Sequence, residues 1–419
     1  MTFNLFILWT FVLVGRPQDL IPAINSIRPA LIVALVTLAF IILGSAKKRI
    51  GALLESKETK KYILFFLVMT AGIPFAYHRK VAFEQVMPSY TINMLFFFSF
   101  ILLVDSFEKL KKVILTITVS TLIYGVFTLV KGTSSSGRLS TYGTMFDPND
   151  IAYVLVSLFP LSLFYLAHKE GFLKKIIAIA AMASAVGVIL LTGSRGGFIS
   201  LAFVALFLLF TNMGGIKKSH KVLFLAAMVV VVVFYSDRIN FERYSTMFSI
   251  EEDYNVTDEF GRLQIWSRAF QLIRSNPFTG VGANCFSMAI GYLREEMHLT
   301  PKWQVAHNSY IQVATEIGLI GFFFFASLIV GGLRTFSKLR RFDIKSPEAS
   351  RFKTLSSLFM VGFVGHLIAA FFLSQGYSIF FTLFFASSAT LNRLANPIPT
   401  KKRVYSRPPS EATLDRPNL

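Results

Sequence analysis

A few polar residues in an otherwise apolar chain could do chemistry, and Arg195 and His307 are the clearest of them. Arg195 lies in a glycine-rich turn, Thr192–Gly197, directly before an apolar segment. A guanidinium beside the free N–H groups of a helix start is a good phosphate site. His307 precedes another apolar segment, where a neutral imidazole could act as a general base. The alternatives, a tight turn with one snorkelling arginine and an interfacial histidine without a catalytic role, stay open.

A helix predicted over residues 258–275 contributes further arginines. At 100° per residue its apolar stripe consists of Leu263, Trp266, Phe270 and Ile273. Arg262 and Arg274 fall on opposite edges of that stripe, and Arg268 points away from it. If the stripe packs on the membrane domain, Arg262 and Arg274 reach inward and Arg268 faces water. The alternative is an amphipathic helix at the membrane surface whose arginines only extend toward water.

Two carboxylates, Asp147 and Asp150, stand just before another apolar segment. Asn149 or Asp150 is expected to cap the helix that follows Pro148. A metal site made from Asp147 and Asp150 is a weak alternative, because two carboxylates rarely hold a divalent ion without substrate oxygens. We therefore expect no metal and no cofactor.

Glu316 follows His307 by nine residues on a predicted membrane helix. At helical pitch the two side chains point in opposite directions, so they do not form a catalytic pair. An unpaired carboxylate inside a membrane is costly, and we expect Glu316 to pair elsewhere, for instance with an arginine.

The composition places these groups in a membrane protein. The chain has 419 residues, of which 54% are hydrophobic and 45 are phenylalanine. Such long apolar runs predict an all-α polytopic membrane protein. About twelve spans are predicted, over residues 3–15, 30–44, 62–77, 89–104, 113–130, 151–167, 174–192, 197–212, 221–235, 308–333, 354–373 and 377–391.

The distribution of Lys and Arg predicts the orientation. Twenty-eight of the 42 lie in the loops and tail on the side of the N-terminus, and seven lie in the short loops of the other side. This asymmetry predicts that both termini are cytoplasmic. It also accounts for the net charge of +19 without nucleic acid as a partner. The chain then divides into helices over 1–235, a long outside loop over 236–306, helices over 307–391 and a basic tail over 392–419.

Several motifs occur in an order that is specific when they are taken together. They are Gly143–Asn149, Thr192–Gly197, Gly261-Arg262 through Trp266, Asn276–Gly282, and His307–Tyr310 followed by Glu316–Gly318. In this arrangement the chain resembles the superfamily of O-antigen ligases and O-antigen polymerases, which includes bacterial protein O-oligosaccharyltransferases. The resemblance is densest over residues 138–330.

The resemblance implies a helical fold related to the GT-C glycosyltransferases, in the bacterial inner membrane with a periplasmic active site. It implies a glycan donor linked to undecaprenyl pyrophosphate and a lipid or glycan acceptor, besides the surrounding membrane lipids. The family roles fall on Arg195 and Arg262 for the pyrophosphate and on His307 as the base. To these we add Arg274, from the helical stripe, as a substrate contact. Further substrate contacts are expected at Arg138, Asn149, Asn308, Tyr310 and Glu316.

These residue types predict an inverting, metal-independent transfer. Guanidinium groups can stabilise a pyrophosphate leaving group, and a neutral histidine can take the proton of the acceptor hydroxyl. The acceptor stays open among lipid A-core, a growing glycan and a protein serine. A transporter or flippase for lipid-linked sugars is the competing class, since it would also need arginines around a pyrophosphate but no base.

Overall fold

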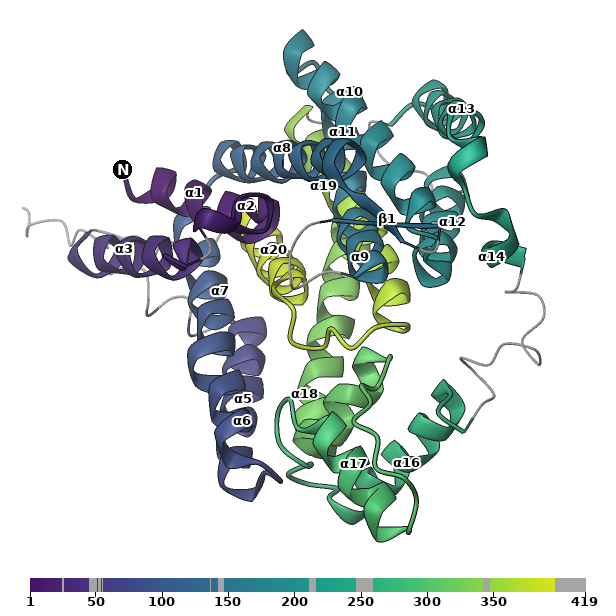
Figure 1. Ribbon diagram of the computed structural model, residues 1–419. Coiled ribbons are helices and arrows are strands. Elements are labelled where there is room, and N and C mark those ends of the chain that lie inside the picture. Colours follow the sequence, from purple (N-terminus) through teal and green to yellow (C-terminus); the bar gives the residue numbers. More distant parts are fainter. Residues whose placement is uncertain are drawn as a thin grey trace, which may run out of the picture.

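Apolar helices make up nearly all of the computed structural model, in agreement with the predicted all-α membrane class (Figure 1). The structure describes residues 1–24, 26–44, 51, 54, 56–135, 137–141, 147–210, 216–245, 259–341 and 347–395. The predicted basic tail beyond residue 395 and the motif residues 143–146 lie outside this part of the chain.

The described helices fall into three consecutive groups along the chain. The first group comprises α1 (Thr2–Gly15), α2 (Pro17–Leu20), α3 (Pro29–Leu43), α5 (Lys57–Gly72), α6 (Arg79–Glu84), α7 (Thr91–Leu103) and α8 (Phe107–Lys131). The second comprises α9 (Pro148–Leu158), α10 (Phe164–Ala167), α11 (Phe172–Leu191), α12 (Arg195–Phe210), α13 (Lys218–Phe234) and α14 (Phe241–Ser245). The third comprises α16 (Arg262–Ser275), α17 (Phe286–Glu296), α18 (Ser309–Arg340), α19 (Pro347–Ala370) and α20 (Ile379–Ala395).

Each of the twelve segments predicted to span the membrane overlaps a helix. Among the described residues, six helices are long and apolar enough to cross a membrane, over 79–103, 107–131, 148–167, 172–191, 309–340 and 349–370. Four shorter apolar helices cover 2–15, 29–43, 195–210 and 379–395. The chain is therefore a helical membrane protein, and the figure of twelve spans stays a prediction.

A hairpin of two short strands, β1 (Thr133–Ser135) and β2 (Arg138–Ser140), follows α8. The strands are antiparallel, and Ser135 lies opposite Arg138. Sequence patterns alone did not indicate this hairpin. It fixes the backbone of Arg138 close to the start of α9.

The long helix α18 is interrupted at Gly318, which has φ 69° and ψ 178°. The segment 276–282 inserts at this break. Val281 and Gly282 donate backbone hydrogen bonds to the carbonyls of Thr315 and Glu316, at 2.9 and 2.8 Å. A Cβ on Gly280 would lie 2.4 Å from the carbonyl carbon of Glu316. The Gly280–Gly282 bend is thus packed tightly against α18.

The helices of the long loop, α16 and α17, pack on each other and on α18 near this break (Figure 1). The buried face of α16 does not follow the apolar stripe predicted for residues 258–275. Ile265, Ala269 and Leu272 are buried together with residues of α6 and α17, whereas Leu263 and Phe270 are each 53% exposed. The prediction of this face was wrong because the small Ala269 admits the close approach of neighbouring helices.

Arg268 was expected to face water and is instead buried. Its Nη1 donates to the carbonyl of Glu259 at 3.3 Å, and the carboxylate of Glu259 pairs with buried Arg294 at 2.8 Å. Burial, followed by the neighbouring Arg294, lowers the pKa of Arg268. These contacts supply the buried guanidinium groups with acceptors and tie α16 to α17.

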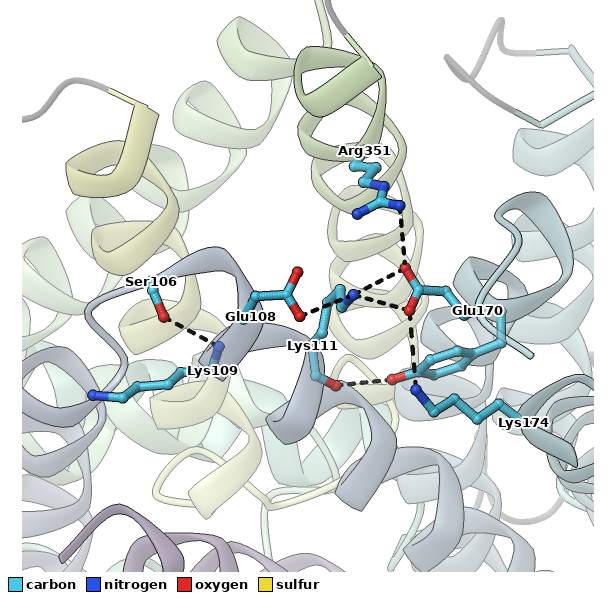
Figure 2. Close-up of polar contacts among 8 residues, drawn as sticks. Ser106, Glu108, Lys109, Lys111, Glu170, Lys174 and Arg351 are labelled. Atoms are coloured by element: carbon cyan, nitrogen blue, oxygen red, sulfur yellow. Dashed lines mark hydrogen bonds and ion pairs between the residues drawn. The ribbon is translucent and has the colours of Figure 1, made fainter.

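A second group of charges lies at the end of the bundle that is predicted to be cytoplasmic (Figure 2). The carboxylate of Glu170 is 7% exposed and lies 2.9 Å from Lys111, 3.8 Å from Arg351 and 4.0 Å from Lys174. These residues come from α8, α11, α19 and the connection before α11. Glu170 therefore links three helices at that end.

Candidate active site

The turn between α11 and α12 is built by its own side chains. Gly193 has φ +58°, and the Ser194 hydroxyl accepts the N–H of Gly197 at 3.2 Å, as a cap of α12. A Cβ on Gly197 would lie 2.5 Å from Cβ of Ala152. The start of α12, with Arg195, is therefore held directly against α9.

Two further arginines donate to the carbonyls of this turn. Nε of Arg138 lies 3.0 Å from the oxygen of Thr192, and Nε of Arg243 lies 2.8 Å from the oxygen of Gly193. Burial, then the charge of Arg243, lowers the pKa of Arg138, and Arg195 contributes in the same direction. The guanidinium groups of Arg243 and Arg195 are thus both within electrostatic reach of that of Arg138. We call Arg138, Arg195 and Arg243 the arginine cluster.

The sequence suggested Arg138 and Arg195 for the site but missed Arg243. Arg243 lies in the short helix α14, early in the long loop. A signal was present, since arginines are scarce on the predicted outer side. The helical pattern drew attention to residues 258–275 instead, because a helix as short as α14 shows no clear apolar stripe.

The acidic segment before α9 faces this cluster. The helix cap is Asp147, whose Oδ1 accepts the N–H groups of Asn149 and Asp150 at 2.7 and 3.0 Å, so the expected cap at Asn149 or Asp150 was wrong. Asp147 is the N-cap because Pro148 occupies the first helical position, directly after it. Asn149 Oδ1 accepts a hydrogen bond from Nη2 of Arg138 at 2.9 Å and so orients one guanidinium of the arginine cluster.

No group of three His, Cys, Asp or Glu side chains within the described ranges could hold a metal ion. Asp150 Oδ1 accepts from Nε2 of Gln375 at 2.9 Å, and Asp147 is engaged in its cap.

His307 lies at the entrance to α18 with a left-handed backbone, φ 48°. The backbone N–H of His307 donates to Oγ of Ser374 at 2.8 Å, and the imidazole side chain is half-buried. Burial, then the charge of Arg262, lowers the pKa of His307, while Asp147 acts in the opposite direction. The structure therefore brings Arg262 and Asp147 each within electrostatic reach of His307, and Asp147 is likewise within reach of Arg138.

Residues 371–378 form a non-helical segment between α19 and α20. This segment contacts both the turn around Arg195 and the residues around His307. The guanidinium of Arg262 lies over the ring of Phe372, 5.9 Å from its centroid, and that ring also contacts the Cα side of Gly196. Ser309 Oγ donates to the carbonyl of Leu373 at 2.7 Å, and Ser374 holds the backbone of His307. No sequence motif indicated this segment, yet it connects the turn of Arg195 to Arg262 and His307.

The remaining expected substrate contacts have other partners. Asn308 is buried and caps α18 through Oδ1, at 2.9 Å from Tyr310 N, and the Tyr310 hydroxyl donates to the carbonyl of Leu367 at 2.7 Å. Glu316 accepts the backbone N–H groups of Asn284 and Phe286, at 2.8 and 3.2 Å, where an arginine had been suggested. Arg274 is exposed near the end of α16. The side chains of Asn308, Tyr310 and Glu316 are thus engaged within the protein, and substrate contacts at these three residues and at Arg274 stay predictions.

The region that supplies most of these groups also matches a protein-family model. Residues 178–326 match the family model described as O-Antigen ligase. Over this segment the chain is similar to the O-antigen ligase superfamily. The resemblance expected from the sequence is confirmed, and the matched range includes Arg195, Arg243, Arg262 and His307. No curated protein matches the chain. The O-antigen ligase family implies membrane glycan processing of the ligase or polymerase type, on lipid-linked glycans.

Proposed function

We propose that this protein is a membrane glycosyltransferase that moves a glycan from undecaprenyl pyrophosphate to an acceptor hydroxyl on the outer face of the bacterial inner membrane. The observation that supports this most directly is the juxtaposition of two unlike groups. A cluster of three arginines surrounds the start of α12, and a histidine with a lowered pKa stands beside it, with Asp147 in reach of both.

The arginine cluster suits the pyrophosphate. Guanidinium groups bind phosphate oxygens bidentately, and the first turn of α12 adds N–H groups and the positive end of its helix dipole. As the bond between the anomeric carbon and the phosphate oxygen breaks, negative charge develops on the pyrophosphate. Fixed positive charges that face the leaving group stabilise that transition state more than the ground state.

His307 suits the acceptor. A lowered pKa keeps its imidazole neutral near pH 7, and a neutral imidazole can accept a proton. The acceptor oxygen attacks the anomeric carbon on the face opposite the pyrophosphate and gives its proton to His307. The glycosidic bond forms with inversion, and undecaprenyl pyrophosphate leaves. Arg262 lies close enough to His307 to favour its neutral form and to assist the leaving group.

The chain's Lys and Arg distribution supports a periplasmic position for these residues, with both termini in the cytoplasm. O-antigen ligation and polysaccharide polymerisation differ only in the acceptor, and the site residues fit both.

The test is a deletion strain complemented with wild type, His307→Ala or Arg195→Ala. Surface polysaccharide and undecaprenyl-linked intermediates are resolved on one gel. We expect wild type to restore polymer or capped lipid, and both variants to accumulate precursor on the outer side. A ladder of chain lengths that depends on the protein would assign a polymerase, and loss of lipid A-core capping with intact chains would assign a ligase.

Two outcomes would overturn this function. Accumulation of precursor on the cytoplasmic side would make the protein a transporter of lipid-linked sugars. Loss of a protease-sensitive glycoprotein band, with lipid-linked polymers unchanged, would make it a protein O-oligosaccharyltransferase.

A further inference from the structure

An open apolar groove runs along the contact between α11 and α13. Its empty volume, counted together with the open space at its mouth, is about 560 Å³, and nine of the ten side chains that line it are apolar. Met182, Val186 and Phe224 are buried and form its floor. Ile179 lies at its rim and is 45% exposed. The groove is therefore open at the side, as a site for a long, flexible apolar chain would need to be.

The groove leads toward the arginine cluster. On α11, Ile179, Met182, Val186 and Leu190 follow one another at helical spacing and share one face. The carbonyl of Leu190 accepts the hydroxyl of Tyr244 at 2.8 Å. Gly193, whose carbonyl accepts from Arg243, comes three residues later. Gly193 follows Val186 by seven positions, which at helical rise is a distance of about 10 Å.

The outer end of the groove is bounded by Tyr235. A Cβ on Gly187 would lie 3.1 Å from the ring of Tyr235 and 3.7 Å from Val231, which lines the groove. The glycine thus lets Tyr235 pack on α11 between the groove and Tyr244. In Figure 1, α13 and α14 lie on the same side of the molecule, beside α12. The apolar and the cationic surfaces are therefore consecutive along one edge of the bundle.

We propose that this groove binds the polyprenyl chain of the pyrophosphate-linked donor. The proposal rests on the proposed function, because the head group it requires is the one assigned to the arginine cluster. A molecule with a doubly phosphorylated head and a long hydrocarbon tail matches this order of surfaces. Burial of the tail's apolar surface against the fixed walls of the groove adds affinity to the ionic contacts of the head.

The test compares two pyrophosphates that share a head group. Undecaprenyl pyrophosphate has a long chain, and geranyl pyrophosphate has two isoprene units and cannot extend along the groove. Binding is measured to the whole protein in nanodiscs of phosphatidylethanolamine and phosphatidylglycerol. Ala227→Trp fills the groove, and Ala226→Trp is its matched control, since Ala226 is exposed on the same helix and does not line the groove.

We expect Ala227→Trp to weaken the binding of undecaprenyl pyrophosphate about tenfold, which corresponds to the loss of roughly two buried methylene groups. Its binding of geranyl pyrophosphate should equal that of wild type, and Ala226→Trp should change neither. Equal effects of the two tryptophans, or an equal effect of Ala227→Trp on both ligands, would overturn the groove assignment. A wild-type protein that binds neither pyrophosphate would overturn the donor site itself.

A second measurement does not depend on a variant that folds. Undecaprenyl pyrophosphate with a photoreactive group in the half of the chain far from the pyrophosphate is bound to the wild-type protein and irradiated. We expect labels on Met182 and Met228, and unlabelled undecaprenyl pyrophosphate should compete for them. Labels confined to lipid-facing residues of other helices would show that ordinary bilayer lipid occupies the groove.

Discussion

Arg243 donates a hydrogen bond of 2.8 Å from Nε to the carbonyl oxygen of Gly193, fifty positions earlier in the chain. Arg138 makes the corresponding contact to Thr192, one residue before Gly193. In both residues Nε is used to hold the turn. The turn between α11 and α12 thus draws together two arginines from distant parts of the sequence beside Arg195.

This contact predicts that Arg243 is required for transfer. Arg243→Ala should lower kcat/KM about 10- to 100-fold, because a charge that stabilises the leaving group is lost. Arg243→Lys should recover part of this loss, since lysine keeps the charge without the fork of donors. Arg238→Ala is the control, because Arg238 is exposed in the same loop. Equal rates for Arg238→Ala and Arg243→Ala would remove Arg243 from the site.

His307 predicts a pH profile. Its pKa lies below the ordinary 6.5, chiefly through burial and then through Arg262, so the neutral base predominates at pH 7. The rate should fall only as the pH drops through this lowered pKa. Removal of the neighbouring cation in Arg262→Gln should raise the pKa of His307, because the imidazolium is then repelled less. The acid limb of kcat/KM should therefore move to higher pH.

An acid limb that stays in place in Arg262→Gln would show that another group controls the profile. His307→Ala should abolish the limb together with most of the activity. A kcat/KM profile measured from pH 5 to 8 on membranes of each variant checks both statements.

The break in α18 predicts a difference between two glycines of the same helix. At Gly318 an alanine would meet the carbonyl oxygen of Phe278 at 2.4 Å and adopt a left-handed backbone, which costs about 1–3 kcal/mol. Gly331 has open space around it, with Lys61 Nζ at 4.0 Å as the nearest atom, and alanine there should stabilise the helix by about 1 kcal/mol. Thermal unfolding in detergent should place the Gly318→Ala midpoint below wild type and that of Gly331→Ala at or above it.

The buried contacts of Glu170 predict that its ion pairs stabilise the fold more than the exposed pair of Glu108 does. The carboxylate of Glu170 is 7% exposed among Lys111, Lys174 and Arg351, so Glu170→Gln leaves cations without their counter-charge (Figure 2). Loss of one partner of a buried pair costs about 3 kcal/mol. Glu108 also pairs with Lys111 but is 68% exposed, and Glu108→Gln should cost less than about 1 kcal/mol. Similar melting midpoints for the two variants would mean that Glu170 is effectively solvated.

Metal independence is open to a direct test. Asp147 and Asp150 use their oxygens for a helix cap and for Gln375. We expect excess EDTA to leave glycan transfer in washed membranes unchanged. If EDTA abolished transfer and magnesium restored it, a metal site at Asp147 and Asp150 would replace the mechanism proposed above.

Much of the fold follows from the sequence, because long apolar runs in a membrane have few alternatives to a helix. The face of a helix is harder to predict. Phe270 is as apolar as a core residue, but it is exposed, while Arg268 on the same helix is buried. In a membrane protein an apolar side chain is stable against lipid as well as against protein, so the apolar stripe of α16 did not indicate its packing face.

Residues of the candidate site could be suggested from the sequence where they form local motifs. Residues that are placed by contacts to distant parts of the chain were missed. Arg195 and His307 stand in recognisable turns, so their roles could be suggested. Arg243 is placed by a hydrogen bond to Gly193, and residues 371–378 are placed by Ser309 and Asp150. Neither relationship has a signature at short range in the sequence, because the partners are separated by fifty or more positions.

The segment 371–378 also sets a limit on how far the protein can be shortened. It lies almost at the end of the described chain, yet Asn93, Asp150, Ser309 and Gln312 all bond to it, from the three helices α7, α9 and α18. A truncation before Phe371 would keep every motif residue and still leave the helices around His307 without their common connection. Deletions from the C-terminus should therefore be tolerated up to α20 and then inactivate the protein abruptly, although no catalytic group has been removed.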